Sequence, residues 1–418
     1  MNYGKEIQID YLARVEGEAS IAVALDGQPD IKLKIFEPPR FFEGFLVGRK
    51  FDEVGDIVSR ICGICPVSHM TTAILAIEQA MGIKVSEQTK ILRKIMTISE
   101  IVASHLIHLY MLAMPDYYGF GGIVEMRDRF TKEITRLMRM KDVMNGLTGL
   151  IGGRALHPVT HLPGGFTTIP PMEKFAGILE QLKQIKPMAA EVVKDISRFN
   201  IPDFHSDSEY VALNNENEYA VDEGNIISTR GLNISVRDYL DSFEEVETSY
   251  AFAKKSAIKG RSSFMTGALA RLNNKFDKLG AETKFLARET GFTVPNDNPF
   301  YNNFAQSLEV FDGINRCIEL IEFNKFKDED VNVTISPGQA GAATEAPRGL
   351  LYHWYKIDRK GFVEQANIVT PTSHNFLNIE KDLKKLVEQN KDKDRDQIRL
   401  LCEQLVRAYD PCFSCSVH

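Results

Sequence analysis

Two Cys-x-x-Cys motifs near opposite ends of the chain constrain its fold more than any other feature. Cys62 and Cys65 lie in RICGICPVSH, and Cys412 and Cys415 lie in DPCFSCSVH, 350 positions further along. Two such pairs supply four thiolates for a metal, provided that folding brings the two ends of the chain together. Structural zinc clips keep their pairs within tens of residues, so this separation is unusual for one.

The first pair directly precedes a predicted helix. Pro66 follows Cys65 and suits a first helical turn, so residues 66–81 are expected to form a helix that ends at Gly82. A helix N-terminus lowers the pKa of nearby thiols and favours the thiolate that binds metal. One pair alone also fits thioredoxin-like redox chemistry or structural zinc, whereas two pairs predict a four-thiolate site.

The composition is that of an ordinary globular protein. The 418 residues are 44% hydrophobic and 26% charged, and the net charge of −7 argues against nucleic acid or an anionic membrane as partner. The N-terminus carries charges throughout, and the most apolar segment, IVASHLIHLYMLAMP, is interrupted by His105 and His108. We therefore expect no signal peptide, no membrane span and a cytoplasmic location.

Cys317 and Cys402 are the cysteines outside the paired motifs. Six cysteines are too few for a disulfide framework in a chain of this length. Both lie in apolar helical patterns, GINRCIELIEF and IRLLCEQLVRA, and are interpreted as buried thiols.

The hydrophobic pattern predicts a mostly α (α+β) fold, in which a bundle of long helices buries the metal site and small antiparallel β-sheets lie at the periphery. Residues 6–36 alternate like strands around a turn at Asp26 and Gly27. Ser86 is the expected N-cap of a long helix that runs to about Met114. Further helices are predicted at 124–144, 172–198, 236–258, 262–290, 300–326, 375–389 and 394–408, with a strand at 331–335 and a hairpin at 350–370.

The segments around both cysteine pairs resemble those of the large, catalytic subunit of nickel–iron hydrogenases. Further family motifs follow in order along the chain: RVEG at 14–17, FFEGFLVGR at 41–49, APRG at 346–349 and IVTPTSHN at 368–375. The resemblance spans essentially the whole chain and implies one domain over residues 1–418. Within it we expect an N-terminal β part over about 1–40, a helical core over about 50–330, and a C-terminal hairpin and helices over about 331–418.

The resemblance implies that the four paired cysteines hold nickel and iron. Cys62 and Cys412 would be terminal thiolates on nickel, and Cys65 and Cys415 would bridge nickel and iron, a role that suits soft thiolate ligands. The iron of this family also carries carbon monoxide and cyanide, which no residue supplies.

Other residues of the site are implied in the same way. Arg348 and Thr372 would donate hydrogen bonds to the cyanides, and Pro347 would shape the pocket wall. Asp410 would lie near the arginine, although an acid before a proline is also an ordinary turn residue. An arginine such as Arg348 is, in the general case, a surface ion-pair partner.

The implied reaction is the reversible heterolytic oxidation of dihydrogen to protons and electrons. The Cys412 thiolate and the Arg348 guanidine are the candidate bases, and Glu16 would relay the proton outward from beside Cys412. A carboxylate suits that relay because burial tunes its pKa toward the working pH. The alternative is that Glu16 pairs locally with Arg14 or caps a local turn.

A second site for magnesium or iron is also implied. Glu43 would supply a carboxylate, His418 an imidazole and Ile368 a backbone carbonyl. Family precursors carry a C-terminal extension that a dedicated protease removes after such a histidine, so a maturation protease and nickel and iron insertion proteins are expected partners.

Several polar residues near the motifs have plainer interpretations. His69 is either a buried, hydrogen-bonded histidine or a support for the metal ligands, and His105 and His108 fit satisfied core histidines. Some family members carry an aspartate near the active-site arginine, at the position of Ser104. A serine carries no negative charge, so this chain lacks an acid at that position.

Electrons must leave through another protein chain. Only two cysteines remain outside the metal site, which is too few for an iron–sulfur cluster, and no GxGxxG fingerprint is present. The resemblance implies a small iron–sulfur subunit. In the compact cytoplasmic branch it also implies flavin-, NAD(P)- or ferredoxin-linked iron–sulfur subunits. Two rivals are a structural zinc protein and the hydrogenase-like quinone-site subunit of respiratory complex I, which has lost the cysteine pairs that this chain retains.

Overall fold

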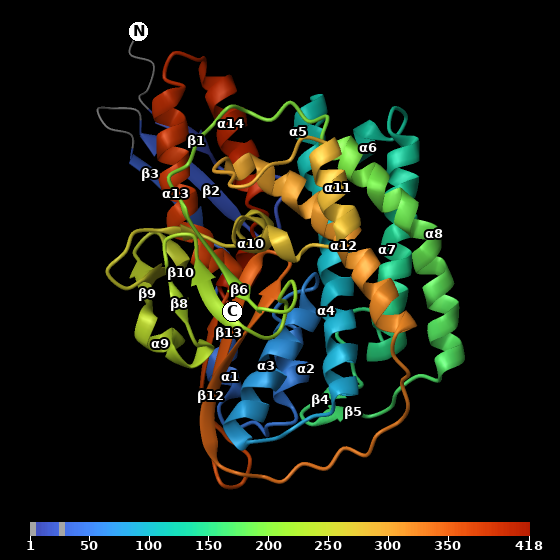
Figure 1. The fold of residues 1–418 in the computed structure, drawn as a ribbon. Helices are drawn as coiled ribbons and strands as arrows, with labels where there is room; N and C mark the ends of the chain where they lie inside the picture. The colour runs from blue at the N-terminus through green and yellow to red at the C-terminus, as the bar shows by residue number, and fades with distance from the viewer. Residues whose placement is uncertain (1–5, 25–29) are drawn as a thin grey trace.

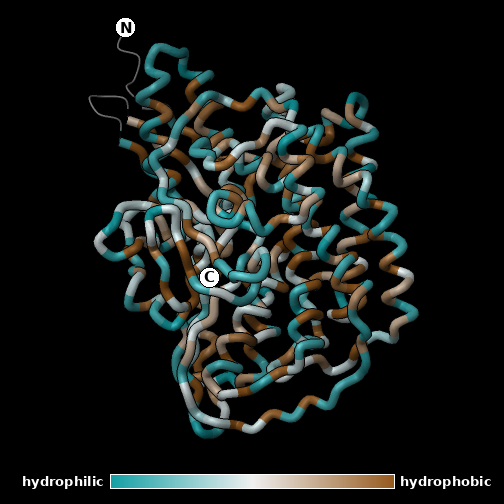
Figure 2. The backbone as a smooth tube through the Cα atoms, in the orientation of Figure 1, coloured by the Kyte–Doolittle hydropathy of each residue, from teal (hydrophilic) through white to brown (hydrophobic). Residues whose placement is uncertain are grey.

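A bundle of long helices forms one side of the protein, with α8 at its outer edge (Figure 1). The structure is a computed structural model that describes residues 6–24 and 30–418. Helix α4 packs against α7 and α12, and α8 packs against the same two helices. Apolar segments lie inside and hydrophilic segments outside (Figure 2), and the predicted mostly helical fold is confirmed. The four helices are α4 (Glu87–Ile107), α7 (Thr131–Gly152), α8 (Met172–Ile196) and α12 (Asn302–Glu322).

Helix α4 begins where the sequence predicts. The Ser86 side chain accepts a hydrogen bond from the Thr89 amide at 3.1 Å, which satisfies one amide at the helix N-terminus. At its far end the helix widens into a π-helix, His108–Ala113, and continues as α5 (Met114–Tyr118). Pro115 has no amide hydrogen, so the regular α-helical hydrogen bond is missing there and the wider turn accommodates the break.

The helical stretch Glu87–Tyr118 is long and apolar enough, by length and composition, to cross a membrane. However, 83% of its most apolar window is buried inside the protein. Its place in the centre of the bundle accounts for its apolar composition.

An antiparallel sheet forms the predicted N-terminal β part. Its strands are β1 (Glu6–Ile9), β2 (Ala19–Ala24) and β3 (Asp30–Ile35), with β2 in the middle. Ile21 of β2 stands opposite Ile9 and Leu33, so buried side chains share one face. The predicted turn at Asp26 and Gly27 lies outside the described residues.

A second antiparallel sheet carries the region of the predicted C-terminal hairpin. β13 (Gly349–Ile357) pairs with β14 (Val363–Val369), as predicted, and also with β12 (Gly338–Ala346). Helix α3 (Pro66–Met81) ends at Gly82, as predicted, and packs on β12 and β13. The helix thereby brings the first cysteine pair to this sheet.

The prediction of a single helix over residues 236–258 is wrong. Only α9 (Tyr239–Ser242) is helical after a short 3-10 turn, and β9 (Phe243–Thr248) and β10 (Ala251–Ile258) form an antiparallel hairpin. Helix α13 (Pro371–Gln389) packs against β10, and this contact favours the extended strand over the local helical preference of its sequence.

Two further predicted elements differ from the structure. The helix predicted at 262–290 is divided into α10 (Ala268–Lys275) and α11 (Ala281–Glu289), because the Gly280 amide leaves the helical pattern to bond Asp312 Oδ1 at 2.9 Å. The strand predicted at 331–335 is irregular and pairs with no strand of the described chain. The remaining elements are α1 (Phe42–Leu46), α2 (Val54–Ser59), α6 (Ile123–Met126), β4 (His161–Leu162), β5 (Gly165–Phe166), β6 (Glu209–Asn214), β7 (Asn225–Ser228), β8 (Asn233–Ile234) and β11 (Phe264–Met265).

The loop around Glu16 and the C-terminal segment meet beside the bundle. Helix α14 (Arg395–Ala408) leads into Cys412 and the short helix α15 (Phe413–Ser416). Glu16 forms a parallel β-bridge with Cys412, and the Phe413 amide donates to the Glu16 carbonyl at 2.9 Å. Backbone pairing therefore makes the closure that the distant cysteine motifs require.

Candidate metal centre

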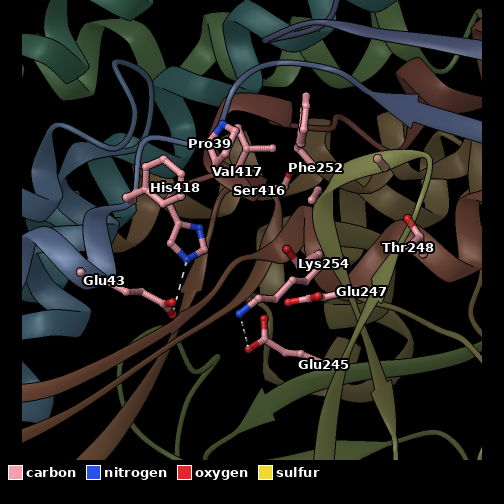
Figure 3. Close-up of a pocket in the computed structure, with 15 residues that line it drawn as sticks. Pro39, Glu43, Glu245, Glu247, Thr248, Phe252, Lys254, Ser416, Val417 and His418 are labelled. Carbon is pink, nitrogen blue, oxygen red and sulfur yellow. Dashed lines mark ion pairs between the residues drawn. The ribbon is translucent and has the colours of Figure 1, made fainter.

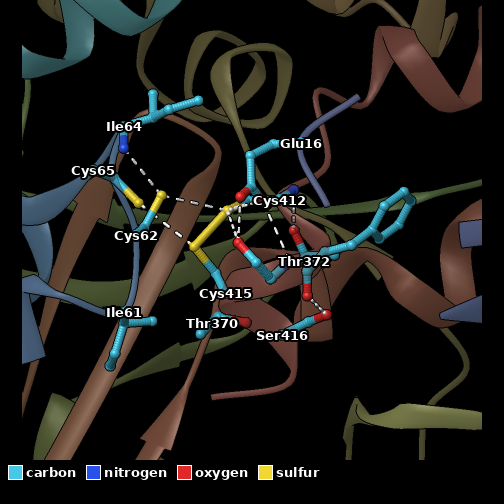
Figure 4. The surroundings of a disulfide bond; sticks show 12 residues. Glu16, Ile61, Cys62, Ile64, Cys65, Thr370, Thr372, Cys412, Cys415 and Ser416 are labelled. Atoms are coloured by element: carbon cyan, nitrogen blue, oxygen red, sulfur yellow. Dashed lines mark hydrogen bonds between the residues drawn. A yellow bond between two sulfur atoms is a disulfide. The ribbon is translucent and has the colours of Figure 1, made fainter. Parts of the chain in front are cut away.

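Four buried sulfur atoms meet where the N-terminus of α3 faces the C-terminal segment (Figure 4). The sulfurs of Cys62, Cys65, Cys412 and Cys415 all lie within 4.8 Å of one another. Cys62 Sγ is 3.6 Å from Cys412 Sγ, and Cys65 Sγ is 3.7 Å from Cys415 Sγ. Cys412 and Cys415 are joined as a disulfide, so a metal held by all four sulfurs needs this pair in its reduced, dithiol form.

Helix α3 positions the first cysteine pair. Cys65 is the N-cap and Pro66 is in the first turn, as predicted, and the Ile64 amide donates to Cys62 Sγ at 3.2 Å. A hydrogen bond from the Cys65 thiol lowers the pKa of Cys62, while the same bond and burial raise the pKa of Cys65. The pair therefore favours one thiolate at Cys62.

Glu16 reaches the sulfur cluster from the loop before β2. Cys412 Sγ lies 2.9 Å from Glu16 Oε2, and the Ser414 amide donates to the same oxygen at 3.3 Å. The Ser414 hydroxyl donates to Glu16 Oε1. Gly17 follows with φ +83°, and a Cβ there would lie 2.7 Å from the Ser414 nitrogen, so only glycine allows this close approach.

Arg14 does not pair with Glu16. It forms an ion pair with Asp116 and donates to the Leu112 carbonyl at 2.7 Å, in the π-helical turn. The ion pair with Arg14 that was considered as an alternative role for Glu16 is therefore absent from the structure. The Glu16 carboxylate instead contacts Cys412 and Ser414.

Arg348 lies in the tight turn between β12 and β13. Its buried side chain pairs with Asp410, with Nη2 3.1 Å from Oδ1. Its Nε and Nη1 atoms are buried and have no hydrogen-bond partner among the described residues. Arg348, Pro347 and Thr372 line a small pocket together with three of the cysteines, so two unpaired N–H donors border that pocket.

Thr372 also supports the second cysteine pair. Its hydroxyl oxygen accepts a hydrogen bond from the Cys412 amide at 2.8 Å. Thr372 is in the first turn of α13, directly after Pro371, so the start of this helix helps to position Cys412. The hydroxyl hydrogen remains available to a ligand in the pocket.

Sequence reasoning missed the group that holds the Pro347–Arg348 turn. Arg271 is fully buried and donates to the Pro347 carbonyl at 3.2 Å, while it pairs with Glu309 at 2.6 Å and Glu345 at 3.0 Å. Burial opposes the charge, but the two carboxylates raise the pKa of Arg271 and keep it ionised. No sequence motif marks this arginine, because its partners come from distant segments.

Glu43 and His418, the predicted side-chain ligands of the second metal site, lie close together and line a pocket (Figure 3). His418 Nε2 is 3.8 Å from Glu43 Oε1, and the Ile368 amide donates to the same oxygen at 2.7 Å. The contact from Ile368 is thus through its amide, while the predicted metal ligand is its carbonyl. Burial works against ionisation of Glu43, but His418 and the Ile368 amide hold its pKa below the usual value.

The histidines named in the sequence have hydrogen-bond partners in the core. His69 Nδ1 is 3.2 Å from His353 Nε2, and burial lowers the pKa of His69 to about 3. His105 bonds Glu309 at 2.8 Å, and His108 bonds the Arg407 carbonyl at 2.7 Å. These contacts agree with the interpretation of His105 and His108 as satisfied core histidines. His69 is buried and hydrogen-bonded and also lines the small pocket beside three of the cysteines, so both of its interpretations remain open.

Glu100 is a further buried acid that the sequence did not indicate. Its carboxylate accepts from the Val67 amide at 2.6 Å and the Ser68 amide at 2.9 Å, at the N-terminus of α3. Burial raises its pKa to about 8 despite these hydrogen bonds. Ser104, the position where an acid was considered, is buried and its hydroxyl has no partner within the described chain.

Cys317 and Cys402 lie apart from the centre. Both are buried free thiols, and burial raises the pKa of each to about 12. Their interpretation as buried thiols is confirmed.

The donor set fits a soft metal pair with small acceptor ligands. Four thiolates suit nickel and iron, and the unpaired N–H groups of Arg348 suit acceptor atoms in the adjoining pocket. The arrangement places one carboxylate, Glu16, within hydrogen-bonding distance of a ligand sulfur. It can therefore combine redox chemistry at the metals with proton transfer through the protein.

Comparisons with known proteins agree with this chemistry. The family described as nickel-dependent hydrogenase matches residues 40–137 and 301–418. The alpha subunit of sulfhydrogenase 1 from Pyrococcus furiosus is 33% identical over 424 residues, which cover 99% of this chain and 97% of that one. The alpha subunit of sulfhydrogenase 2 from the same organism is 32% identical, over 99% of this chain and 98% of that one.

Solved structures share the fold. A crystal structure of an NAD+-reducing [NiFe]-hydrogenase in the H2-reduced state superposes with a TM-score of 0.89 at 22% identity and covers 100% of both chains. The Ni-Fe-Se hydrogenase of D. vulgaris Hildenborough superposes with a TM-score of 0.77 at 22% identity, over 99% of both chains.

Proposed function

Because this chain belongs to the nickel-dependent hydrogenase family and is the catalytic subunit of a nickel–iron hydrogenase, we propose residue roles for its centre. Cys62, Cys65, Cys412 and Cys415 would hold the nickel–iron group, Cys62 and Cys412 as ligands of nickel and Cys65 and Cys415 as ligands shared with iron. Glu16 carries protons away from Cys412. The single observation that carries this proposal is the 2.9 Å contact between Cys412 Sγ and Glu16 Oε2 at the edge of the four-sulfur cluster.

In this proposal the protein side chains transfer the proton and place a positive charge beside the metal pocket. When bound, the nickel–iron group supplies the site at which dihydrogen is split. The Cys412 sulfur takes the proton and passes it to the Glu16 carboxylate, which is already in hydrogen-bond contact. Arg348 is the second candidate base, but its ion pair with Asp410 favours the protonated guanidinium, which cannot accept a proton. The contact between Cys412 and Glu16 therefore favours Cys412 as the base.

Carbon monoxide and cyanide ligands on the iron are also part of the proposal. The unpaired Nε and Nη1 of Arg348 support it, because cyanide nitrogens accept hydrogen bonds. Thr372 donates through its free hydroxyl hydrogen, and Pro347 forms an apolar wall.

We infer that the second site holds magnesium, or iron in its place. Glu43 and His418 supply side-chain ligands, and the Ile368 carbonyl completes the protein ligands. The lowered pKa of Glu43 favours this role, because a hard cation binds the ionised carboxylate.

The electrons pass to a small iron–sulfur subunit, which hands them on to a soluble acceptor such as NAD(P) or ferredoxin. The two remaining cysteines are buried in separate helices, α12 and α14, which supports a cluster in another chain. Exposed aromatic side chains at Phe41, Phe45 and Phe252 offer apolar surface for a partner. Flavin-containing subunits, a maturation protease, metal-insertion proteins and a cytoplasmic location remain predictions.

Metal analysis combined with infrared spectroscopy of the purified complex tests the proposal. We expect stoichiometric nickel and iron, together with infrared bands from iron-bound carbon monoxide and cyanide. The Cys62→Ser and Cys412→Ser variants should lose nickel, whereas Cys402→Ser should retain it. Stoichiometric zinc without nickel and without dihydrogen-dependent dye reduction would support a structural zinc site instead.

A further inference from the structure

Arg271 binds the main chain directly before Arg348. Its Nη1 donates to the Ala346 carbonyl at 3.1 Å, and its Nη2 donates to the Pro347 carbonyl at 3.2 Å. Glu309 accepts hydrogen bonds from Nε and Nη2 of the same guanidinium, at 2.6 Å each. Because Glu309 belongs to the bundle helix α12, this planar two-point contact fixes both carbonyls relative to the bundle.

Thr266 binds the main chain after Arg348. Its hydroxyl oxygen accepts a hydrogen bond from the Leu350 amide at 2.8 Å. Gly349 has φ +129°, and a Cβ there would lie 2.5 Å from Thr266 Oγ1, so only glycine allows this close approach. Thr266 comes just before α10 and Arg271 lies in its first turn, so one short segment holds the turn on both sides of Arg348.

The same segment is bound to helix α13, which carries Thr372. The Thr266 amide donates to Asn375 Oδ1 at 2.8 Å, and Asn375 Nδ2 donates to the Thr266 carbonyl at 3.2 Å. Asn375 follows Thr372 by three residues on α13. Thr266, Asn375 and Arg271 are all buried, which strengthens their hydrogen bonds. Arg348 and Thr372, two donors beside the metal pocket, are therefore held by one buried network.

We propose that Arg271, Thr266 and Asn375 are positioning residues that fix the N–H donors of Arg348 relative to Thr372. None of the three lines the metal pocket, so they act through the main chain that carries Arg348. A hydrogen bond weakens steeply when its geometry is lost, so donors are most effective when they are held in place beforehand. The role of the network rests on the proposed function, in which Arg348 and Thr372 donate to iron-bound cyanides.

Two substitutions loosen the network at different points. Arg271→Lys keeps the positive charge, but a single amine cannot bind the Glu309 carboxylate and both carbonyls in one plane. Thr266→Val keeps the size of the side chain and removes the acceptor of the Leu350 amide, whereas Thr266→Ser keeps the hydroxyl. Arg348→Lys serves as the reference, because it alters the donor itself.

The bundle offers a matched control for each substitution. Arg93 is as buried as Arg271 and binds Glu78 at two points, at 2.7 and 2.6 Å, so Arg93→Lys loosens a comparable ion pair. Thr148 is a buried threonine of α7 whose hydroxyl donates to the Met144 carbonyl at 3.3 Å, so Thr148→Val is the second control.

Three measurements on the assembled enzyme compare these variants. They are the infrared bands of iron-bound cyanide, dihydrogen-dependent dye reduction, and backbone amide exchange of residues 346–352 followed by mass spectrometry. We expect Arg271→Lys and Thr266→Val to shift the cyanide bands, as Arg348→Lys does, and to speed amide exchange in this segment. Dye reduction should fall by about tenfold, because the donor is displaced and not removed. Thr266→Ser should resemble the wild type, and both controls should leave the cyanide bands unchanged.

Unchanged cyanide bands in Arg271→Lys and Thr266→Val, when Arg348→Lys shifts them, would overturn the inference and leave the role of Arg348 intact. Equal band shifts in Arg93→Lys would likewise reduce Arg271 to a general contribution to stability. If Arg271→Lys does not assemble, Thr266→Val decides by the same criterion, because it keeps the buried ion pairs. Unchanged bands in Arg348→Lys would instead contradict the proposed function from which the inference starts.

Discussion

Asp116 and Arg407 form a two-point contact that ties the C-terminal segment to the helix bundle. Arg407 Nε lies 2.6 Å from Asp116 Oδ2, and Arg407 Nη2 lies 2.9 Å from Asp116 Oδ1. Asp116 also pairs with Arg14, two residues before Glu16, and Arg407 donates to the Ala13 carbonyl at 2.9 Å. One carboxylate on α5 therefore holds both chain segments that meet at the metal centre.

We predict that Asp116→Asn destabilises the protein and displaces Glu16. An asparagine cannot balance two guanidinium groups, and Arg407, at 1% exposure, would keep only its 3.3 Å ion pair with Glu403. The loss should be about 3 kcal/mol in the free energy of unfolding, measured by thermal or denaturant unfolding. Asp128→Asn is the control, because Asp128 is 92% exposed in its ion pair and should change stability little. An unchanged melting temperature in Asp116→Asn would contradict this role.

We predict that Gly17→Ala prevents the contact between Glu16 and Cys412. An added methyl group would lie 2.9 Å from Phe413 Cβ and 2.7 Å from the Ser414 nitrogen, so the two segments must move apart. Gly48→Ala is a matched control, because Gly48 has the same φ of +83° but nothing within 4 Å of an added Cβ. Both variants carry the backbone strain, of the order of 1 kcal/mol, and only Gly17→Ala adds the clash. Nickel content and hydrogen exchange should fall in Gly17→Ala alone.

The sequence predicted elements whose signals are local. Pro66 and Gly82 bound α3, and Ser86 caps α4, and each signal involves only neighbouring residues. The strands β9 and β10 were predicted as helix, because their extended conformation depends on packing against α13 and on pairing with each other. Local patterns carry no information about such contacts.

The same distinction applies to the metal centre. The four cysteines were found because their motifs are contiguous, and the resemblance supplied Glu16, Glu43 and Arg348. Arg271 and Glu100 were missed, because each becomes relevant only through segments that folding brings beside it. An arginine and a glutamate within helices look ordinary until those neighbours are known.

We predict that Glu16→Gln uncouples proton movement from metal assembly. Glutamine keeps the hydrogen-bonding size of the side chain, but it cannot accept a proton from Cys412. Hydrogen exchange with water should fall by about a hundredfold or more, while nickel, iron and the infrared bands of the site remain. Mass spectrometry of HD formed from D2 in ordinary water measures this rate. Near-normal exchange would remove Glu16 from the proton route.

We predict that Asp382 makes stability fall as the pH rises from about 4 to about 6. Asp382 is fully buried between the Ser206 hydroxyl and the Tyr409 hydroxyl, each 2.5 Å from one of its oxygens. Burial raises its pKa from 3.8 to about 6, although these two hydrogen bonds oppose the shift. Between these values the folded protein holds a proton that the unfolded chain has lost. The contribution of Asp382 is therefore complete below the lower value and is lost as the pH passes the upper one, by up to about 3 kcal/mol.

Asp382→Asn isolates this contribution, because the amide stays neutral at every pH and keeps one acceptor oxygen. The difference in unfolding free energy between wild type and Asp382→Asn should change across this window and become constant above about pH 7, since the wild-type carboxyl is then ionised in both states. Denaturant unfolding at a series of pH values measures the difference. A pH-independent difference would mean that Asp382 has the same pKa in the folded and the unfolded chain, contrary to its burial.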